Sequence, residues 1–559
     1  MSHPPLKTAL QRHFVMVRGQ YGTRQVHYRR GGQGPVVLLL HQSPQSSREM
    51  EPLIEAWGQS FTLIAPDSPG YGFSQPLQRA GQPVTSATID DFAAATLEFV
   101  DTLGIGRFGV YGFHTGASIG VALAHSFPSR VVAVAANGFV VLTEHERTAM
   151  LGDYLPPLVP RWDGGHLAWL WGRMREQTIF FPWHDHRAAT RMTFDVPTAD
   201  RLQQGLDEFL AAGNQYHVAY AAAFSDRGER RLPNVRAPLL LTAAARDPLA
   251  GHLARIGARS ATVQIVPSVD ASAALGQAFA HLASYPGDSG PVADSDGQVA
   301  SDALSFGISE YRGQPGRQLR LIRRAARETG TGRTVILLHA PGSSAASLAS
   351  LAGNLANYAD VLSVDLPGHG ASDPPATIEA GGALAGTVTQ LSAALAPSLA
   401  TAGTTLVAIG SSAPVAIELA ADLGRHTRVV LLEPPAWSAT DTEEWLRHGL
   451  PAITPVWSGG HLLEAWHLIR DGRLFSPWFR RGPAGIRPGE PDLDDAHIHR
   501  DVRDLLRANG AWQALLRDAL GYQDDRGATR GLGIIRLEQA PQNWADVLVP
   551  GRAGNRPAS

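Results

Sequence analysis

Much of this 559-residue sequence occurs twice. Three short motifs recur at a constant separation of 298 residues: VVLLLH at 36–41 and TVILLH at 334–339, DSPGYG at 67–72 and DLPGHG at 365–370, and GFHT at 112–115 and GSSA at 410–413. Two further pairs are 295 residues apart: WDGGHL at 162–167 with WSGGHL at 457–462, and PW at 182–183 with PW at 477–478. Self-similarity on this scale indicates a tandem duplication, so one copy of the repeat must be able to form a fold of its own.

Composition marks the boundary between the copies. Residues 286–302 are rich in Pro, Gly, Ser and Asp and lack apolar periodicity, which is typical of a linker. We therefore predict a first domain at 1–285, a linker at 286–303, a second domain at 304–548 and a flexible tail at 549–559.

The composition also argues against several classes of function. The chain has no cysteine, which removes disulfides, thiolate metal sites and cysteine nucleophiles. Its 48 basic and 51 acidic side chains nearly balance, so nothing favours nucleic acid or an anionic membrane as a partner. No stretch approaches the ~20 apolar residues of a membrane helix, and the first residues lack the apolar core of a signal peptide. We therefore expect a cytoplasmic protein.

Copy one alternates short apolar runs with helical patterns. The expected strands are residues 35–40, 61–66, 108–112, 131–136, 238–242 and 262–266. One helix is expected over 88–104, where Thr88 and Asp91 can form a capping box, and another over 115–125. Buried strands that alternate with helices predict an α/β fold with a mainly parallel, doubly wound sheet.

The segment 108–125 carries the most specific motif. A strand runs into Gly112–Gly116 (GFHTG) and then into a helix of small residues, which is the Gly-x-Nuc-x-Gly spacing of a nucleophile elbow. With His41, the loop at 67–74 and Asp247 after the fifth strand, this motif makes each copy resemble the α/β-hydrolase superfamily over nearly its whole length. The resemblance implies two α/β-hydrolase-like domains, each with a helical cap inserted after the fourth strand.

The resemblance places the caps at about 140–232 in copy one and about 438–528 in copy two. A cap of this kind roofs the active site and shapes the substrate pocket. The first cap is crowded with aromatic side chains: Trp162, Trp169, Trp171, Phe180, Phe181 and Trp183. We expect most of them to serve packing, and we take Trp183 and His41 as candidates for substrate contact.

Copy one departs from the catalytic triad that the resemblance implies, namely a nucleophile at the elbow, an acid after a late strand and a histidine after the last strand. Asp247 supplies the acid, but His114 stands at the elbow. Residues 266–272 (VPSVDAS) contain no histidine, and the next one, His281, falls inside an expected helix. The usual triad is therefore absent.

Any chemistry would then depend on His114. At the elbow tip its imidazole would enter the pocket, with Asp247 on one ring nitrogen and the substrate at the other, as a general base or a nucleophile. The backbone N–H groups of Thr115 and Gln42 would form an oxyanion hole. Two alternatives stay open, a decayed or ligand-binding site and Thr115 as the nucleophile.

Copy two shows further losses. Ser412 matches His114, but Pro414 replaces the closing glycine, and proline lacks an N–H and fixes φ. Residues 534–537 already read as the last strand, so a late strand and its acid are missing. We expect a truncated second domain with one strand fewer and an inert Ser412.

Two His-x-His pairs stand apart from these motifs, at 184–186 and 497–499. Metal sites can use such spacing, but neither pair is matched in the other copy, so we interpret them as surface histidines. No metal or organic cofactor is implied.

These features predict one active site, in copy one, for hydrolysis or a related lyase step on a small, partly apolar molecule. The alternative is a non-catalytic member of the fold that binds a ligand or serves as a scaffold. The shared cap motifs also predict an internal pseudo-dimer with Trp183 and Trp478 at its interface, because fused copies of a former homodimer keep its two-fold contact.

Overall fold

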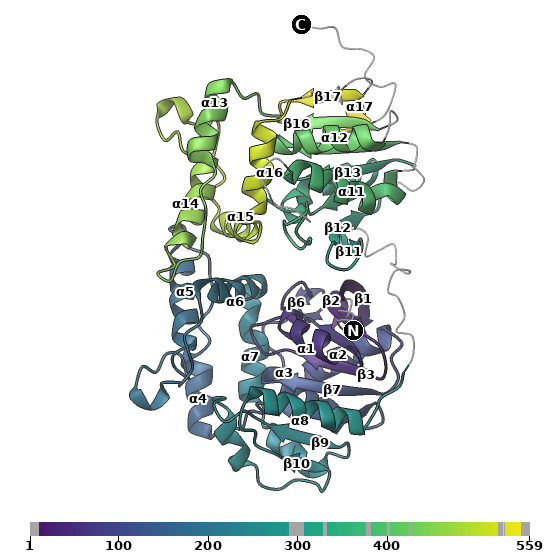
Figure 1. The fold of residues 1–559 in the computed structure, drawn as a ribbon, viewed down its shortest axis with the longest axis vertical. Helices are drawn as coiled ribbons and strands as arrows, with labels where there is room; N and C mark the ends of the chain where they lie inside the picture. Colours follow the sequence, from purple (N-terminus) through teal and green to yellow (C-terminus); the bar gives the residue numbers. More distant parts are fainter. Residues whose placement is uncertain are drawn as a thin grey trace, which may run out of the picture. The chain divides into compact units, whose positions relative to one another are not determined.

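The structure, a computed structural model, describes residues 10–289, 307–327, 332–375, 382–399, 403–423, 427–523, 529 and 532–548. The chain divides into two compact units, which follow the sequence from purple to yellow in Figure 1. Unit 1 comprises 1–159, 166–298 and 455–459, and unit 2 comprises 160–165, 299–454 and 460–559. The predicted tail and the predicted linker from residue 290 onward lie outside the described residues.

Unit 1 contains an eight-stranded sheet in the order β1-β2-β4-β3-β7-β8-β9-β10. Its strands are β1 (Gln11–Gly19), β2 (Gly22–Gly32), β3 (Val36–Leu40), β4 (Thr62–Pro66), β7 (Phe108–Phe113), β8 (Val131–Asn137), β9 (Leu239–Thr242) and β10 (Val263–Ile265). Strands β3, β4 and β7 to β10 pair in parallel, and only β1 and β2 run antiparallel to their neighbours. The predicted mainly parallel α/β sheet is confirmed.

The antiparallel hairpin of β1 and β2 was not predicted from the sequence. Its second strand reads GTRQVHYRRGG and is buried along most of its length, although three of its buried side chains are basic. Each of these side chains has an acidic partner: Arg24 with Glu98 at 2.9 Å, His27 with Asp67 at 2.8 Å and Arg29 with Glu51 at 2.7 Å. Because these charges are paired, they can be buried, and the strand therefore lacks the apolar run by which the other strands were predicted.

Helices cover both faces of the sheet. On one face α1 (Glu51–Trp57) and α8 (Ala271–Ser284) pack on apolar strand residues such as Leu39. On the other face lie α2 (Ile89–Thr102) and α3 (Thr115–Ser126). Helix α2 begins with the predicted capping box, in which Thr88 and Asp91 bind each other's backbone N–H groups.

The predicted cap of copy one is a set of helices between β8 and β9, in the teal and blue part of unit 1 in Figure 1. The main helices are α4 (Glu144–Asp153), α5 (Gly165–Gln177), α6 (Ala199–Ala212) and α7 (Tyr216–Ser225). Parallel strands deliver the residues that follow them to one sheet edge, so the loops after β3, β7 and β9 meet beneath this cap.

The described part of unit 2 forms a seven-stranded sheet, one strand fewer than in unit 1, as predicted. Its order is β11-β12-β14-β13-β15-β16-β17, with bounds β11 (Ile308–Arg312), β12 (Leu319–Arg324), β13 (Thr334–Leu338), β14 (Asp360–Val364), β15 (Thr404–Ile409), β16 (Arg428–Leu432) and β17 (Gly533–Leu537). The sheet is flanked by α10 (Ala349–Leu355), α11 (Ala383–Leu399), α12 (Ala413–Leu423) and α17 (Ala545–Leu548). The cap helices are α13 (Ala439–Glu444), α14 (Gly460–Leu474), α15 (Asp495–Arg507) and α16 (Ala511–Leu520).

The repeated Trp-x-Gly-Gly-His-Leu motif has a packing explanation inside each unit. In unit 1, Gly459 has φ +79°, and a Cβ there would lie 2.5 Å from the buried indole of Trp171. That indole donates a hydrogen bond to the Trp457 carbonyl at 3.0 Å. In unit 2, Gly164 leaves the same room for Trp466. The motif is retained because a glycine with positive φ admits a large ring.

Candidate active site

The elbow after β7 is built by the close approach of backbone segments. His114 has φ +48° and ψ −108°, a conformation that costs a non-glycine residue about 1–3 kcal/mol. The flanking glycines are required by space: a Cβ on Gly112 would lie 2.2 Å from the Gly116 carbonyl oxygen, and a Cβ on Gly116 would lie 2.1 Å from that of Leu40. The tight turn holds the imidazole of His114 at the start of α3.

The structure brings His114 and Asp247 together. His114 Nε2 lies 2.9 Å from Asp247 Oδ2, and the Leu249 N–H donates to Asp247 Oδ1 at 2.8 Å. The side chains are 22% and 9% exposed. Burial alone would raise the pKa of Asp247, but the hydrogen bond and charge of His114 and the Leu249 N–H outweigh it and lower that pKa. An ionised carboxylate only accepts, so Nε2 carries the ring proton and Nδ1 the basic lone pair.

Two neighbours fix the plane of the His114 ring. The Phe113 ring stacks on it, with centroids 4.1 Å apart and an interplanar angle of 30°. Gly138, just after β8, lies on the ring's Cδ2 side, where a Cβ would be 2.2 Å away. The imidazole is therefore held by Asp247, by a flat aromatic surface and by a gap that only glycine leaves open.

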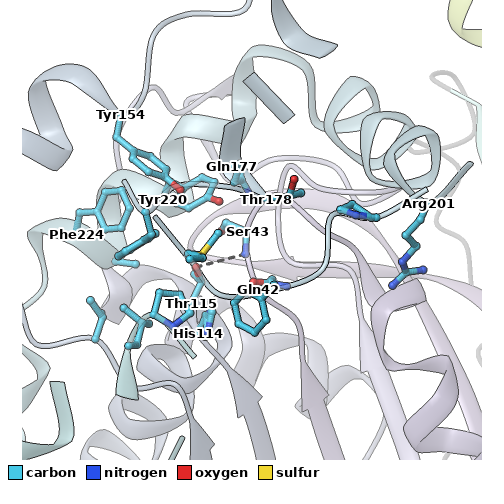
Figure 2. A pocket seen from close by; sticks show the side chains of 18 of the residues that line it. Gln42, Ser43, His114, Thr115, Tyr154, Gln177, Thr178, Arg201, Tyr220 and Phe224 are labelled. Atoms are coloured by element: carbon cyan, nitrogen blue, oxygen red, sulfur yellow. Dashed lines mark hydrogen bonds between the residues drawn. The ribbon is translucent and has the colours of Figure 1, made fainter. Parts of the chain in front are cut away.

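His114, but not Asp247, lines a cavity of about 670 Å³. Its floor is polar and comes from loops at the sheet edge: Gln42, Ser43, His114 and Thr115. The opposite wall comes from the cap, and Figure 2 shows Tyr154, Tyr220 and Phe224 there. Phe181, Met192, Phe194 and Leu249 add apolar surface. The cavity suits a small molecule with one polar end and one apolar end.

The two predicted oxyanion donors, the backbone N–H groups of Thr115 and Gln42, differ in whether they already have a hydrogen-bond acceptor. Thr115 opens α3, so its backbone N–H is one of the helix's first, which have no intrahelical acceptor. The prediction for Gln42 is wrong, because its N–H already donates to Glu49 Oε2 at 3.0 Å. The Ser43 N–H, 3.4 Å from Thr115 Oγ1, is only weakly bound and is the better second donor.

His41 is a structural residue, contrary to its prediction as a substrate contact. The ring is 1% exposed, and burial lowers its pKa. Its Nδ1–H donates to the Gln42 carbonyl at 2.8 Å, and its Nε2 accepts the Ser68 N–H at 2.9 Å. His339 makes the equivalent two bonds in unit 2. The histidine persists in both copies because it ties two loops together.

Trp183 does not line the cavity, so the structure does not support its prediction as a substrate contact. Its indole N–H donates to the Tyr154 carbonyl at 3.1 Å, and the Arg173 guanidinium lies 5.3 Å from its ring centre. Trp183 therefore supports Tyr154, whose own side chain reaches the cavity. The expectation that cap aromatics mainly pack describes this residue well.

The loop after the last strand of unit 1 carries no histidine in the position that a triad would need. Ser268 stands there instead, with its hydroxyl 2.9 Å from Thr242 Oγ1 and 2.6 Å from Gln277 Oε1. His281 lies in α8, 3.4 Å from the Pro238 carbonyl. The dyad of His114 and Asp247 has no third triad member from this loop.

The match of Ser412 to His114 is wrong. Leu40 on β3 pairs with Gly112, whereas the equivalent Leu338 on β13 pairs with Ala408. This register places Gly410 at the elbow tip, and its φ of +57° agrees with the +48° of His114. Copy two therefore has no side chain at the tip.

Ser412 corresponds to Gly116 and Pro414 to Ser118, two residues away from the positions predicted for them. Ser412 is fully buried, with its hydroxyl 2.8 Å from the Ile409 carbonyl and 3.2 Å from the Leu338 carbonyl. Its hydroxyl is thus committed to backbone acceptors, which supports the prediction that it is inert.

The His-x-His pairs offer no metal centre. The described residues contain no group of three or more His, Asp or Glu side chains arranged to hold an ion. His186 lies 3.5 Å from Glu176 and His497 lies 2.9 Å from Asp492, in half-exposed pairs. None of the described helices is both long and apolar enough to cross a membrane.

Comparison with known proteins assigns both copies to one superfamily. A profile of the alpha/beta hydrolase fold matches residues 35–256, and a profile of the alpha/beta hydrolase family matches residues 335–554. The chain is 32% identical to the soluble epoxide hydrolase of Corynebacterium sp. over 120 residues, which are 22% of this chain and 38% of that protein. It is 31% identical to the 2-(acetamidomethylene)succinate hydrolase of Mesorhizobium japonicum over 134 residues, or 24% and 46% of the two chains.

A solved structure of a Vigna radiata epoxide hydrolase mutant superposes with a TM-score of 0.37 and 19% identity, over 49% of this chain and 95% of that one. The chain covers less than half the length of the curated relatives it matches. Two family profiles, one on each copy, together match most of the sequence. The chain belongs to the alpha/beta-hydrolase superfamily and carries two of its domains in tandem.

Proposed function

We propose that copy one is an enzyme that hydrolyses a small, partly apolar molecule, or cleaves it in a related lyase step, at a single site formed by His114 and Asp247. The observation that carries this proposal is the 2.9 Å bond between these side chains at the floor of a cavity. A carboxylate hydrogen-bonded to an imidazole holds the ring in one tautomer and one orientation, as an acid–base catalyst requires.

In the proposed mechanism, His114 Nδ1 removes a proton from a water molecule that attacks the bound substrate. Asp247 stabilises the resulting imidazolium, which then returns the proton to the leaving group. The Thr115 N–H, with Ser43, stabilises negative charge on the substrate oxygen. Direct attack by Nδ1 on the substrate is the nucleophilic variant of the same arrangement.

Relatives support the class of reaction. Two of them are named as hydrolases of small molecules, an epoxide hydrolase and a 2-(acetamidomethylene)succinate hydrolase. Copy two supplies no competing side chain at its elbow tip, because glycine stands there. The cytoplasmic location, and the internal pseudo-dimer with Trp183 and Trp478, stay predictions.

The second candidate is a non-catalytic ligand-binding protein. The observation that favours it is Ser268, which fills the place of the triad histidine and is fully engaged by Thr242 and Gln277. A cavity with polar floor and apolar walls serves a binder as well as an enzyme.

Turnover of a panel of esters, amides, epoxides and C–C-cleavage substrates separates the two. We expect His114→Ala to abolish turnover, apart from a residual rate from the backbone donors, and Asp247→Asn to lower kcat by about 100-fold or more. Ser412→Ala is the matched control and should leave kcat unchanged. Equal turnover by wild type and His114→Ala would refute the catalytic assignment. No turnover, but a rise in Tm with a panel compound that His114→Ala removes, would establish the binder.

A further inference from the structure

The proposed mechanism leaves one pair of polar groups at the cavity unused. Gln42 lines the cavity, and its side-chain N–H₂ donates a short hydrogen bond to Glu49 Oε1. Its backbone N–H donates to the other oxygen of the same carboxylate, Glu49 Oε2, at 3.0 Å. Glu49 thus accepts two hydrogen bonds from Gln42, one from its side chain and one from its backbone, and these bonds fix the loop after β3.

The hydrogen bond to Glu49 determines the orientation of the Gln42 carboxamide. A carboxylate only accepts, so the nitrogen end of the amide must face Glu49. The amide oxygen and the second N–H then remain, and no other described residue forms a hydrogen bond with them. Because one bond already restrains the side chain of Gln42 and another restrains its backbone, little further ordering is needed when a ligand binds.

We propose that Gln42, held by Glu49, is a specificity-determining residue that selects a carboxamide group on the ligand. A carboxamide both donates and accepts, so it can satisfy the amide oxygen and the free N–H of Gln42 together. This inference deepens the proposed function, since it concerns the same cavity. The substrate class it names is a small amide with a compact apolar substituent, for which Phe181, Phe224 and Leu249 provide the wall.

Other polar groups fit this floor less well. An ester has no donor for the Gln42 oxygen, which would be left unpaired beneath the bound ligand. A carboxylate has no donor for the Gln42 oxygen either. Sites built to hydrogen-bond a particular group discriminate against analogues that lack it.

Binding of three probes with the same apolar half tests the proposal: phenylacetamide, methyl phenylacetate and phenylacetate. Dissociation constants would be measured in the Asp247→Asn variant of the full chain, which keeps His114 at the cavity and in which turnover is expected to be slow. The measurement would be made at pH 8, where the Glu49 carboxyl is ionised, because burial raises its pKa to about 7 against the opposing hydrogen bonds from Gln42. We expect phenylacetamide to bind at least about 10-fold more tightly than either analogue.

Three further variants test whether Gln42 causes that preference for the amide. Gln42→Leu should remove it while keeping the backbone bond to Glu49. Glu49→Gln should reduce the amide-to-ester ratio, because the amide of Gln42 would no longer be held in one orientation. Gln45→Leu makes the same chemical change at a glutamine that does not line the cavity, and it should keep the ratio.

Equal affinity for amide and ester, no binding of phenylacetamide at millimolar concentration, or a preference that survives Gln42→Leu would each overturn the proposal. The outcome is independent of catalysis. A preference without turnover by wild type would sink the enzymatic function and leave this inference standing. Turnover of panel substrates without the preference would do the reverse.

Discussion

At the scale of single residues, Gly138 offers a direct test of the dyad. A Cβ at this position would lie 2.2 Å from His114 Cδ2, and the backbone has φ +72°. We expect Gly138→Ala to push the imidazole away from Asp247 and to lower kcat/KM at least 10-fold, because a misplaced base loses its alignment. Gly152→Ala is the control, since nothing lies within 4 Å of its Cβ position. Unchanged kinetics in a folded Gly138→Ala protein would show that the ring position is not critical.

Glu49 gives a prediction about stability and pH. Burial raises its pKa from 4.5 to about 7 in the folded chain. Between these values the unfolded chain has lost the proton that the folded chain keeps, so folding is favoured at the lower pH and stability falls as pH rises toward about 7. The upper limit of this loss is about 3 kcal/mol.

Chemical denaturation at pH 5 and pH 7.5 checks this. Wild type should lose more unfolding free energy between the two pH values than Glu49→Gln, which has no proton to release at this site. Equal losses in the two proteins would mean that Glu49 titrates normally in the folded state.

Sequence reasoning found some of these residues and missed others for physical reasons. His114 and Asp247 were found because each follows a strand, and strand ends at one edge of a parallel sheet converge. Glu49 was missed, because its neighbours Arg48 and Met50 give no sign that its carboxyl is buried against Gln42. His41 was misassigned because a residue kept at a site can be kept to hold loops together.

At the scale of elements, the two elbows show how far a matched motif can mislead. The letters Gly-x-x aligned His114 with Ser412, but the sheet register aligns it with Gly410. Ala408 and Ser412 then stand where copy one has Gly112 and Gly116. Only the sheet register distinguishes the two alignments, since the local sequences are too short to fix a shift of two residues.

The difference in packing predicts different tolerance to alanine. Gly116→Ala would place a Cβ 2.1 Å from the Leu40 carbonyl oxygen, a backbone atom that cannot turn aside, and we expect a loss of about 3 kcal/mol or more. The equivalent Ser412→Ala removes a hydroxyl that bonds to backbone carbonyls, and we expect about 1 kcal/mol. Thermal unfolding should therefore show a clearly larger fall in Tm for Gly116→Ala. A fall as large in Ser412→Ala would contradict the register drawn here.

At the scale of the whole molecule, the repeat in the sequence was sufficient to predict two similar sheets and the loss of a late strand in copy two. The hairpin of β1 and β2 was missed because buried strands with paired charges lack the apolar signature on which strand prediction depends. The chemistry of the second domain could not be predicted in detail, since it depends on where its elbow begins.

The last prediction is that each chain binds one ligand molecule, in the cavity of unit 1, although the chain has two domains of one superfamily. Unit 1 has a tip side chain, an acid after β9 and a cavity above them. Unit 2 has a glycine at the tip, and β17 lies directly beside β16, where copy one has β9, the strand that precedes Asp247. Isothermal titration with whichever panel compound raises Tm should give one site per chain. His114→Ala should weaken or abolish that site without uncovering another. Two sites per chain, or a site that survives in His114→Ala and is lost in a variant at Gly410, would place ligand binding in copy two and overturn the single-site architecture.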